Sequence, residues 1–181
     1  MSCDIGAGRL EPCKDSVGGI IAIYISNYTS GLLNAPSAGG ATFGTNDEIT
    51  AFASPLTFYK YDLKGANSFE QTNENSRENG TSFWTQTGTI VLKKQDLATR
   101  KELKLLSYGR PQVIVQDYNG NYFLAGIENG CECAVNTATG TAMGDLNGYN
   151  ITFTGTEKAP AFFVDSTIIG DTTNTVVVVG T

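Results

Sequence analysis

The sequence predicts a mainly β fold in which antiparallel hairpins form a β-sandwich or a barrel-like structure. Charged residues are only 17% of the chain. The remaining polar residues are mostly Thr, which favours strands, and Gly, Asn and Ser, which favour turns. Several segments alternate apolar and polar residues, as half-buried strands do. A length of 181 residues is typical of one domain and allows a core without disulfides or metals. Residues 1–181 are therefore expected to form one structural domain.

The first third of the chain is predicted to contain three strands. Residues 1–18 have no periodic pattern and are expected to form an irregular N-terminal arm. Residues 20–26 are apolar on both faces, as in a strand whose sheet is covered on both sides. Residues 27–47 are rich in Gly, Ser, Ala and Asn and are expected to form a long surface loop. Two further strands are predicted at 48–53 and 56–63.

The longest predicted element is a β-hairpin over residues 67–94. Its arms are expected at Ser68–Thr72 and Thr81–Leu92, and its polar tip at Asn73–Gly80. The tip has no core to bury, so it is either a solvated loop or a contact with a neighbouring subunit. The candidate contact residues at this tip are Asn73, Glu74, Arg77 and Glu78.

One helix is predicted, from about residue 95 to residue 107. Asp96 is placed to cap its N-terminus, and Gly109 and Pro111 are placed to end it. The residues expected to dock the helix on a sheet are Leu97, Leu103 and Leu106.

The segment after the helix is predicted to be a series of hairpins. Strands at 112–116 and 122–127 flank Asn119-Gly120, a pair that suits a type I′ turn. A Gly-rich loop is expected at 137–148, followed by a strand whose Tyr149, Ile151 and Phe153 face one way. The other strands are predicted at 131–136, 161–164 and 175–179.

The C-terminal strand, residues 175–181, is a second candidate contact. Four consecutive β-branched apolar residues are an aggregation hazard if they form an unpaired edge. The strand must therefore close the chain's own sheet or add to a neighbour's, and deleting it is expected to impair assembly or solubility. Its candidate contact residues are Val176, Val177, Val178 and Val179.

No pattern in the sequence predicts an enzyme, a metal site or a cofactor. The chain has no histidine, which removes the commonest general base and the usual Ser and Cys triads. No phosphate-binding glycine motif occurs between a strand and a helix. Asp145-Leu146-Asn147-Gly148 lacks the acidic residues of a calcium loop and is interpreted as a turn. Nothing in the sequence places Asp47 and Glu48, or Glu128 and Glu132, across a cleft.

The four cysteines are interpreted as small buried residues, with a zinc site or a disulfide as alternatives. They are Cys3, Cys13, Cys131 and Cys133. In a strand, Cys131 and Cys133 would point to the same face. The usual C-x₂-C spacing of a zinc knuckle is absent.

The charge and the N-terminal sequence limit the partners. A net charge of −6 argues against binding a phosphate backbone. Met1-Ser2-Cys3-Asp4 does not resemble the start of a secretory signal, and no apolar run reaches the ~18 residues of a membrane span. The chain is therefore expected to fold in a cytoplasm without a membrane segment.

Three motifs give the chain a family resemblance. Val113 to Gly130 reads V-I-V-x-D-x-N-G-x-Y-x-L-x-G-x-x-N-G, and Gly140 to Glu157 reads G-T-A-M-G-D-L-N-G-Y-x-x-T-F-T-G-x-E. Cys13 to Ile20 reads C-K-D-S-V-G-G-I. With the order of predicted elements, these motifs resemble the tail tube proteins of tailed bacteriophages.

The resemblance implies a virion structural protein rather than an enzyme. It implies a protomer made in the bacterial host cytoplasm, six of which form a ring in the phage tail. Rings would stack through loops and the N-terminal arm, and the 67–94 hairpin would make ring or inter-ring contacts. The lumen would be acidic and would conduct DNA without binding it tightly. Other tail proteins at the tube ends, and a sheath, would be further partners.

Two other functions fit the composition. A capsid decoration or head–tail completion protein would share it but assemble with a different symmetry. A carbohydrate-binding β-sandwich would use Trp84 and tyrosines as a sugar platform, although packing in the core is the simpler interpretation of these aromatic residues.

Overall fold

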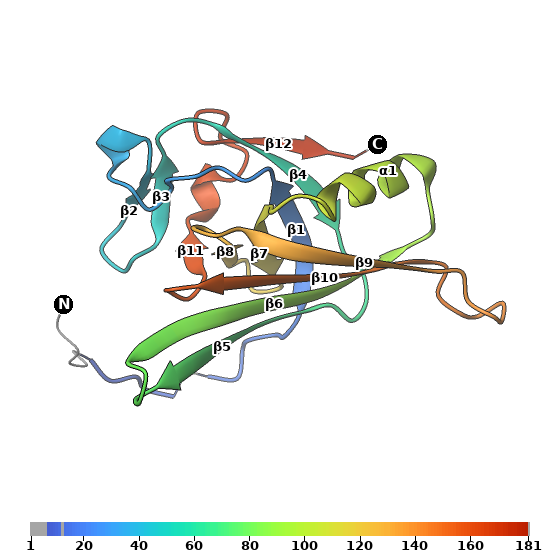
Figure 1. Ribbon diagram of the computed structural model, residues 1–181, viewed down its shortest axis with the longest axis horizontal. Coiled ribbons are helices and arrows are strands. Elements are labelled where there is room, and N and C mark those ends of the chain that lie inside the picture. The colour runs from blue at the N-terminus through green and yellow to red at the C-terminus, as the bar shows by residue number, and fades with distance from the viewer. Residues whose placement is uncertain (1–6, 12, 181) are drawn as a thin grey trace.

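The computed structural model describes residues 7–11 and 13–180 and shows a mainly β fold with one α-helix (Figure 1). The strands of the larger sheet are β1 (Ile20–Ser26), β2 (Ala41–Phe43), β3 (Ile49–Phe52), β4 (Leu56–Asp62), β7 (Gln112–Asp117), β8 (Tyr122–Ala125), β11 (Phe162–Val164) and β12 (Thr175–Val179). Those of the smaller sheet are β5 (Ser68–Ser76), β6 (Thr81–Lys93), β9 (Cys131–Ala138) and β10 (Gly148–Glu157). The helices are α1 (Leu97–Leu106) and the short 3₁₀ helices η1 (Pro36–Ala38) and η2 (Ser166–Ile168).

The two sheets pack as layers, which confirms the sandwich-like prediction. The larger sheet has the strand order β12-β4-β1-β7-β8-β11-β3-β2, and the smaller has the order β5-β6-β10-β9. Pairing is antiparallel except for β12 with β4 and β11 with β3, which run parallel. Over the described residues the larger sheet begins at β12 and ends at β2, so it does not close into a barrel.

The larger sheet is covered on both faces, and strand β1 shows this directly. Ile23 and Ile25 join a core that includes Ile90, Ile151 and Phe153 of the smaller sheet. The alternate residues of β1, Ala22 and Tyr24, join a second core on the opposite face of the sheet. An apolar run with both faces buried is what the sequence of β1 predicted.

Helix α1 has the predicted cap but not the whole predicted apolar face. The Asp96 side chain accepts hydrogen bonds from the backbone N–H groups of Ala98 and Thr99. Leu103 is buried and Leu106 packs against the first core, whereas Leu97 is 84% exposed, so its predicted docking was wrong. At 3.6 residues per turn, Leu97 lies about 120° around the helix from Leu103.

Three other local predictions need correction. The segment 27–47 is not a plain surface loop, because it contains η1 and β2 and buries Leu32 and Ala41. The hairpin tip is shorter than predicted, because β5 continues through Ser76 and only residues 77–80 form the turn. Strand β9 likewise continues to Ala138, into the predicted 137–148 loop.

The turn between β7 and β8 is not of type I′, which would require a positive φ at both Asn119 and Gly120. Gly120 has a φ of 86°, but Asn119 is not in the left-handed region. The Asp117 carboxylate accepts hydrogen bonds from the backbone N–H groups of Asn119 and Asn121, at 2.9 and 2.7 Å. This local acceptor stabilises a turn with one left-handed residue instead of two.

Candidate functional site

The outer face of the smaller sheet, pointing away from the first core, is covered with threonines. In the register of β6 with β10, Thr85 pairs with Thr156, Thr87 with Thr154, and Thr89 with Thr152. The alternate residues of β10 are buried, so these threonines point outward. We call this surface the threonine face: Ser68, Glu70, Thr72 and Glu74 of β5, Thr85, Thr87 and Thr89 of β6, Thr152, Thr154 and Thr156 of β10, and Glu132 and Ala134 of β9.

The threonine face comes from a five-residue pattern that occurs twice. Residues 85–89 read T-Q-T-G-T and residues 152–156 read T-F-T-G-T. Each glycine leaves space on the inner face, for the Phe153 ring at Gly88 and for the Cys131 sulfur at Gly155. Gly88 pairs with Phe153, and Gly155 pairs with Gln86. This repeated pattern is the sequence signal for the surface, and none of the predictions made from the sequence rests on it.

The buried amide of Gln86 ties the smaller sheet to neighbouring segments. Its side chain is 1% exposed. Its Oε1 accepts a hydrogen bond from the Gly126 N–H at 3.0 Å, and its Nε2 donates to the Ala159 carbonyl at 3.2 Å. A buried amide that is satisfied on both sides fixes the relative position of the segments it joins.

The charged residues among those that define the threonine face are all glutamates. Glu70 and Glu74 lie on β5, and Glu132 lies on β9. Lys93 has the same strand parity as the β6 threonines, but it is the last residue of β6 and lies at the end of the sheet. Phe83 and Val91 have this parity too and lie toward the two ends of β6, so the middle of the face is rich in hydroxyl groups and acidic, while one end carries a lysine.

Neither edge strand of the smaller sheet pairs with a further strand over the part of the chain that the structure describes, although the Cys131 N–H of β9 donates to the Pro111 carbonyl at 2.8 Å. Strand β5 pairs with β6 on one side only, and β9 pairs with β10 on one side only. The two edge strands are similar in length, with nine residues in β5 and eight in β9. An open edge presents unpaired backbone N–H and C=O groups that can pair with another chain.

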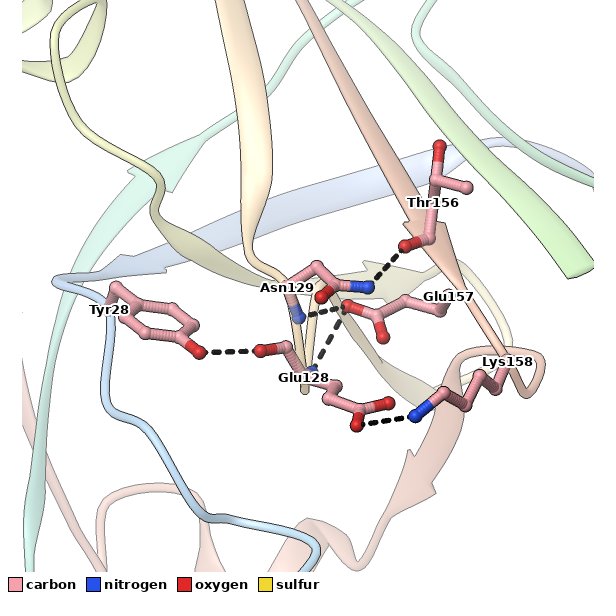
Figure 2. Close-up of polar contacts among 6 residues, drawn as sticks. All are labelled: Tyr28, Glu128, Asn129, Thr156, Glu157 and Lys158. Carbon is pink, nitrogen blue, oxygen red and sulfur yellow. Dashed lines mark hydrogen bonds and ion pairs between the residues drawn. The ribbon is translucent and has the colours of Figure 1, made fainter.

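A buried carboxylate holds the turn that leads into edge strand β9 (Figure 2). Glu157, at the end of β10, is 2% exposed. Its Oε1 accepts hydrogen bonds from the backbone N–H groups of Glu128 at 3.1 Å and Asn129 at 2.8 Å. The Asn129 side chain donates in return to the Thr156 carbonyl at 2.8 Å. These bonds fix the start of β9 against the end of β10.

The same turn is anchored on its other side, as Figure 2 also shows. The Tyr28 hydroxyl donates to the Glu128 carbonyl at 2.5 Å, and Lys158 forms an ion pair with Glu128 at 2.9 Å. Burial raises the pKa of Glu157, and the hydrogen bonds from Asn129 and Glu128 only partly oppose this shift. The cluster binds the chain's own backbone, so its evident role is to position the β9 edge.

The hairpin residues singled out from the sequence lie at one end of the smaller sheet. Glu74 belongs to strand β5, and its Oε1 accepts a hydrogen bond from the Thr85 hydroxyl at 3.1 Å. Asn73 is engaged within the hairpin, since its amide donates to the Phe83 carbonyl at 3.1 Å. Arg77 and Glu78 are exposed in the turn.

The C-terminal valines lie elsewhere, at the top of the view in Figure 1, where β12 forms an edge of the larger sheet. Val177 packs against the second core, whereas Val176, Val178 and Val179 are exposed. The structure shows β12 paired with β4 in the chain's own sheet, and over the described residues no strand pairs with its other side. The structure does not bring the valines together with the hairpin turn.

The cysteines do not share one environment. Cys131 is buried and Cys133 packs beside it against the first core, as two residues on one strand face should. Cys13 is exposed, so the buried interpretation was wrong for it. Cys3 lies outside the described residues, as do the rest of 1–6, residue 12 and residue 181.

The carboxylates considered from the sequence have local structural roles. Glu132 points out from the threonine face, whereas Glu128 lies in the preceding turn. Asp145 accepts hydrogen bonds from the backbone N–H groups of Thr141 and Ala142, both at 2.8 Å, and so stabilises its own loop. The Glu48 carboxylate accepts a hydrogen bond from the Asn46 N–H at 2.9 Å. Among residues 7–11 and 13–180, no group of three or more Cys, Asp or Glu side chains is placed to hold a metal ion.

Within the described residues, no helix is long and apolar enough to cross a membrane. The chain matches no known protein family, no curated protein and no solved structure.

Proposed function

We propose that this chain is the tail tube subunit of a tailed bacteriophage, assembling into rings whose lumen conducts DNA. One observation carries the proposal beyond the motif resemblance. The smaller sheet combines two open edges of similar length with a broad uncovered face whose charges are acidic. A sheet of this kind is suited to form one segment of a closed wall.

The two open edges favour a ring over a simple dimer. Strand β5 of one copy would pair with strand β9 of the next, so each contact joins two different surfaces. A contact of this heterologous type closes into a ring when the rotation between copies permits it. Six copies of a four-stranded sheet would give about 24 strands, and a spacing of about 4.8 Å makes this wall about 37 Å across. Such a ring has room for a DNA duplex.

The chemistry of the threonine face suits passage rather than binding. Proteins that hold DNA do so largely with Lys and Arg against phosphates. Glu70, Glu74 and Glu132 would instead repel the phosphates, and the threonine hydroxyl groups would keep the wall hydrated. A lumen lined by this face would let DNA slide without a favoured resting position.

Cross-linking between the two edges tests the ring directly. Thr72 and Ala134 are exposed on the threonine face at opposite edges of the sheet. In a Cys3→Ser and Cys13→Ser background, Thr72→Cys combined with Ala134→Cys should give, on oxidation, a ladder of covalent oligomers that ends at the ring size. Glu132→Cys and Asn136→Cys replace Ala134→Cys to sample neighbouring registers.

The control for this experiment is Thr72→Cys alone, which should give no ladder. If none of the three double-cysteine variants gives oligomers beyond the dimer under conditions in which the protein self-associates, the edges do not meet and the proposed ring is wrong.

A further inference from the structure

Three lysines surround a depression at the end of the smaller sheet opposite the hairpin turn. Lys64 lies before the start of β5. Lys93 is the last residue of β6, and Lys94 follows it. They line a depression of about 290 Å³ together with Val91 and Thr99. Gly65 follows Lys64 in the chain, and a Cβ on Gly65 would lie 3.5 Å from the Lys93 ammonium nitrogen. Lys93 is therefore close to the backbone beside Lys64. We call this feature the lysine groove.

Among the described residues, none of the three lysines of the lysine groove forms an ion pair. Over the described residues there are only two ion pairs, Lys60 with Asp62 and Lys158 with Glu128. Asp62, which also lines the depression, is thus paired with Lys60 at 3.0 Å.

The other carboxylate close to the groove in the chain is Asp96, and it is occupied as the N-cap of α1. The hydrogen bonds that it accepts from backbone N–H groups lower its pKa, and the positive charge of Lys94 lowers it further without forming an ion pair. Lys64, Lys93 and Lys94 are therefore left as exposed cations around a concave surface.

The opposite end of the same hairpin carries the opposite charge. Glu78 is exposed in the hairpin turn next to Arg77, and Glu74 is exposed in β5, two residues before the end of the strand. Figure 1 shows the β5–β6 turn at the lower left, while β6 runs across to its other end below α1. We call Glu74 and Glu78 the acidic hairpin end. With Arg77 between them the two glutamates leave one net negative charge, so one continuous hairpin has a weakly acidic end and a basic end.

We propose that the acidic hairpin end of one copy docks against the lysine groove of a second copy. This inference rests on the proposed function, because rings built from the smaller sheet would present the hairpin turns on one rim and the lysine grooves on the other. When rings stack in the same direction, the acidic hairpin ends of one ring meet the lysine grooves of the next. When two like rims meet, glutamates face glutamates or lysines face lysines. The contact would therefore fix the polarity of the stack.

A charge-swap experiment tests this contact. Glu74→Lys with Glu78→Lys makes both ends basic, and Lys64→Glu with Lys93→Glu makes both ends acidic. Each variant alone should form single rings but lose the stacked tubes, as followed by sedimentation and electron microscopy. An equimolar mixture of the two should recover the tubes, because each variant then meets an end of opposite charge.

A matched control changes the same number of charges elsewhere. Arg100→Glu with Lys101→Glu reverses two exposed cations of α1 that do not line the lysine groove, and this variant should still form tubes. Circular dichroism of every variant establishes that each one folds.

Two results would overturn the inference, and they are distinguishable. If each variant forms rings but the mixture recovers no tubes, or if either variant stacks alone, the charge contact is wrong while the ring proposal stands. If the unmodified protein forms no rings under any condition, the proposed function is wrong and the stacking contact is wrong with it.

Discussion

The ring of Phe153 lies so close to Gly88 that a Cβ on residue 88 would be 2.1 Å from the Phe153 Cζ atom. Phe153 is 1% exposed and belongs to the first core. The missing side chain of Gly88 therefore lets β6 and β10 pair while an aromatic ring fills the space between the sheets. The relationship joins the repeated T-x-T-G-T pattern to the packing of the sandwich.

Replacing Gly88 with Ala should be severely destabilising. The new methyl group would collide with a buried ring that has little freedom to move, and overpacking of this kind costs about 3 kcal/mol. Urea denaturation of Gly88→Ala against the unmodified protein measures the effect. Gly144→Ala is the matched control, because no atom lies within 4 Å of its added Cβ. Equal stability of the two variants would contradict the packing account.

The buried carboxyl of Glu157 should make stability depend on pH. Burial raises its pKa, so the folded protein holds this proton more tightly than the unfolded chain does. The resulting stabilisation is complete below the ordinary pKa of Glu, about 4.3, and is lost as the pH rises through the raised pKa. Glu157→Gln keeps an oxygen that can accept both backbone hydrogen bonds but has no proton to lose.

The free energy of unfolding, measured for both proteins across this pH range, checks the prediction. The advantage of the unmodified protein over Glu157→Gln should shrink as the pH rises. Parallel curves would show that Glu157 has the same proton affinity in the folded and unfolded chain.

The valines of β12 should divide into one structural residue and several exposed ones. Val177 packs against the second core, so Val177→Ala should lower the free energy of unfolding by about 1 kcal/mol. Val179 is 60% exposed, and Val179→Ala should change stability by less than about 0.5 kcal/mol. Thermal denaturation of the two variants tests this, and a larger effect at Val179 would contradict the placement of β12.

These point variants are cleaner than deleting residues 175–181. The deletion would remove a strand that pairs with β4 and the buried Thr175, whose hydroxyl donates to the Ile168 carbonyl at 2.6 Å. The truncated chain should therefore be less stable whether or not the strand takes part in assembly.

Positive charges on the threonine face should turn a passive surface into a DNA-binding one. Thr89 and Thr156 are exposed on this face, and Thr89→Lys with Thr156→Lys should produce assemblies that retain duplex DNA at low salt and release it at high salt. The matched control, Thr42→Lys with Thr57→Lys, places the same charges at exposed positions of the larger sheet. Equal DNA retention by the two variants would show that the threonine face is not the lumen surface.

Local features of the fold were predictable where a few neighbouring residues determine the backbone conformation. The bounds of β1 and β12 agree with the sequence prediction, and Asp96 caps α1 as expected. The alternation of Tyr149, Ile151 and Phe153 correctly identified the buried face of β10. In each case the signal lies in a few neighbouring residues.

The pairing of distant strands could not be predicted in the same way. Strand β12 lies parallel to β4, more than 100 residues earlier in the chain, and no local pattern specifies that choice. The open edges of β5 and β9 depend on the strand order of the whole sheet, so the central feature of the candidate site required the structure. The T-x-T-G-T pattern was visible in the sequence. The strand register shows that its two occurrences, in β6 and β10, lie side by side and form one surface.

Electron microscopy of the purified protein at rising concentration, with light scattering on the same samples, tests the central claim most directly. The account predicts hollow rings with a central opening that stack into tubes as the concentration rises. A protein that stays a monodisperse monomer at every concentration, even with preformed tail tips added to initiate assembly, would contradict it.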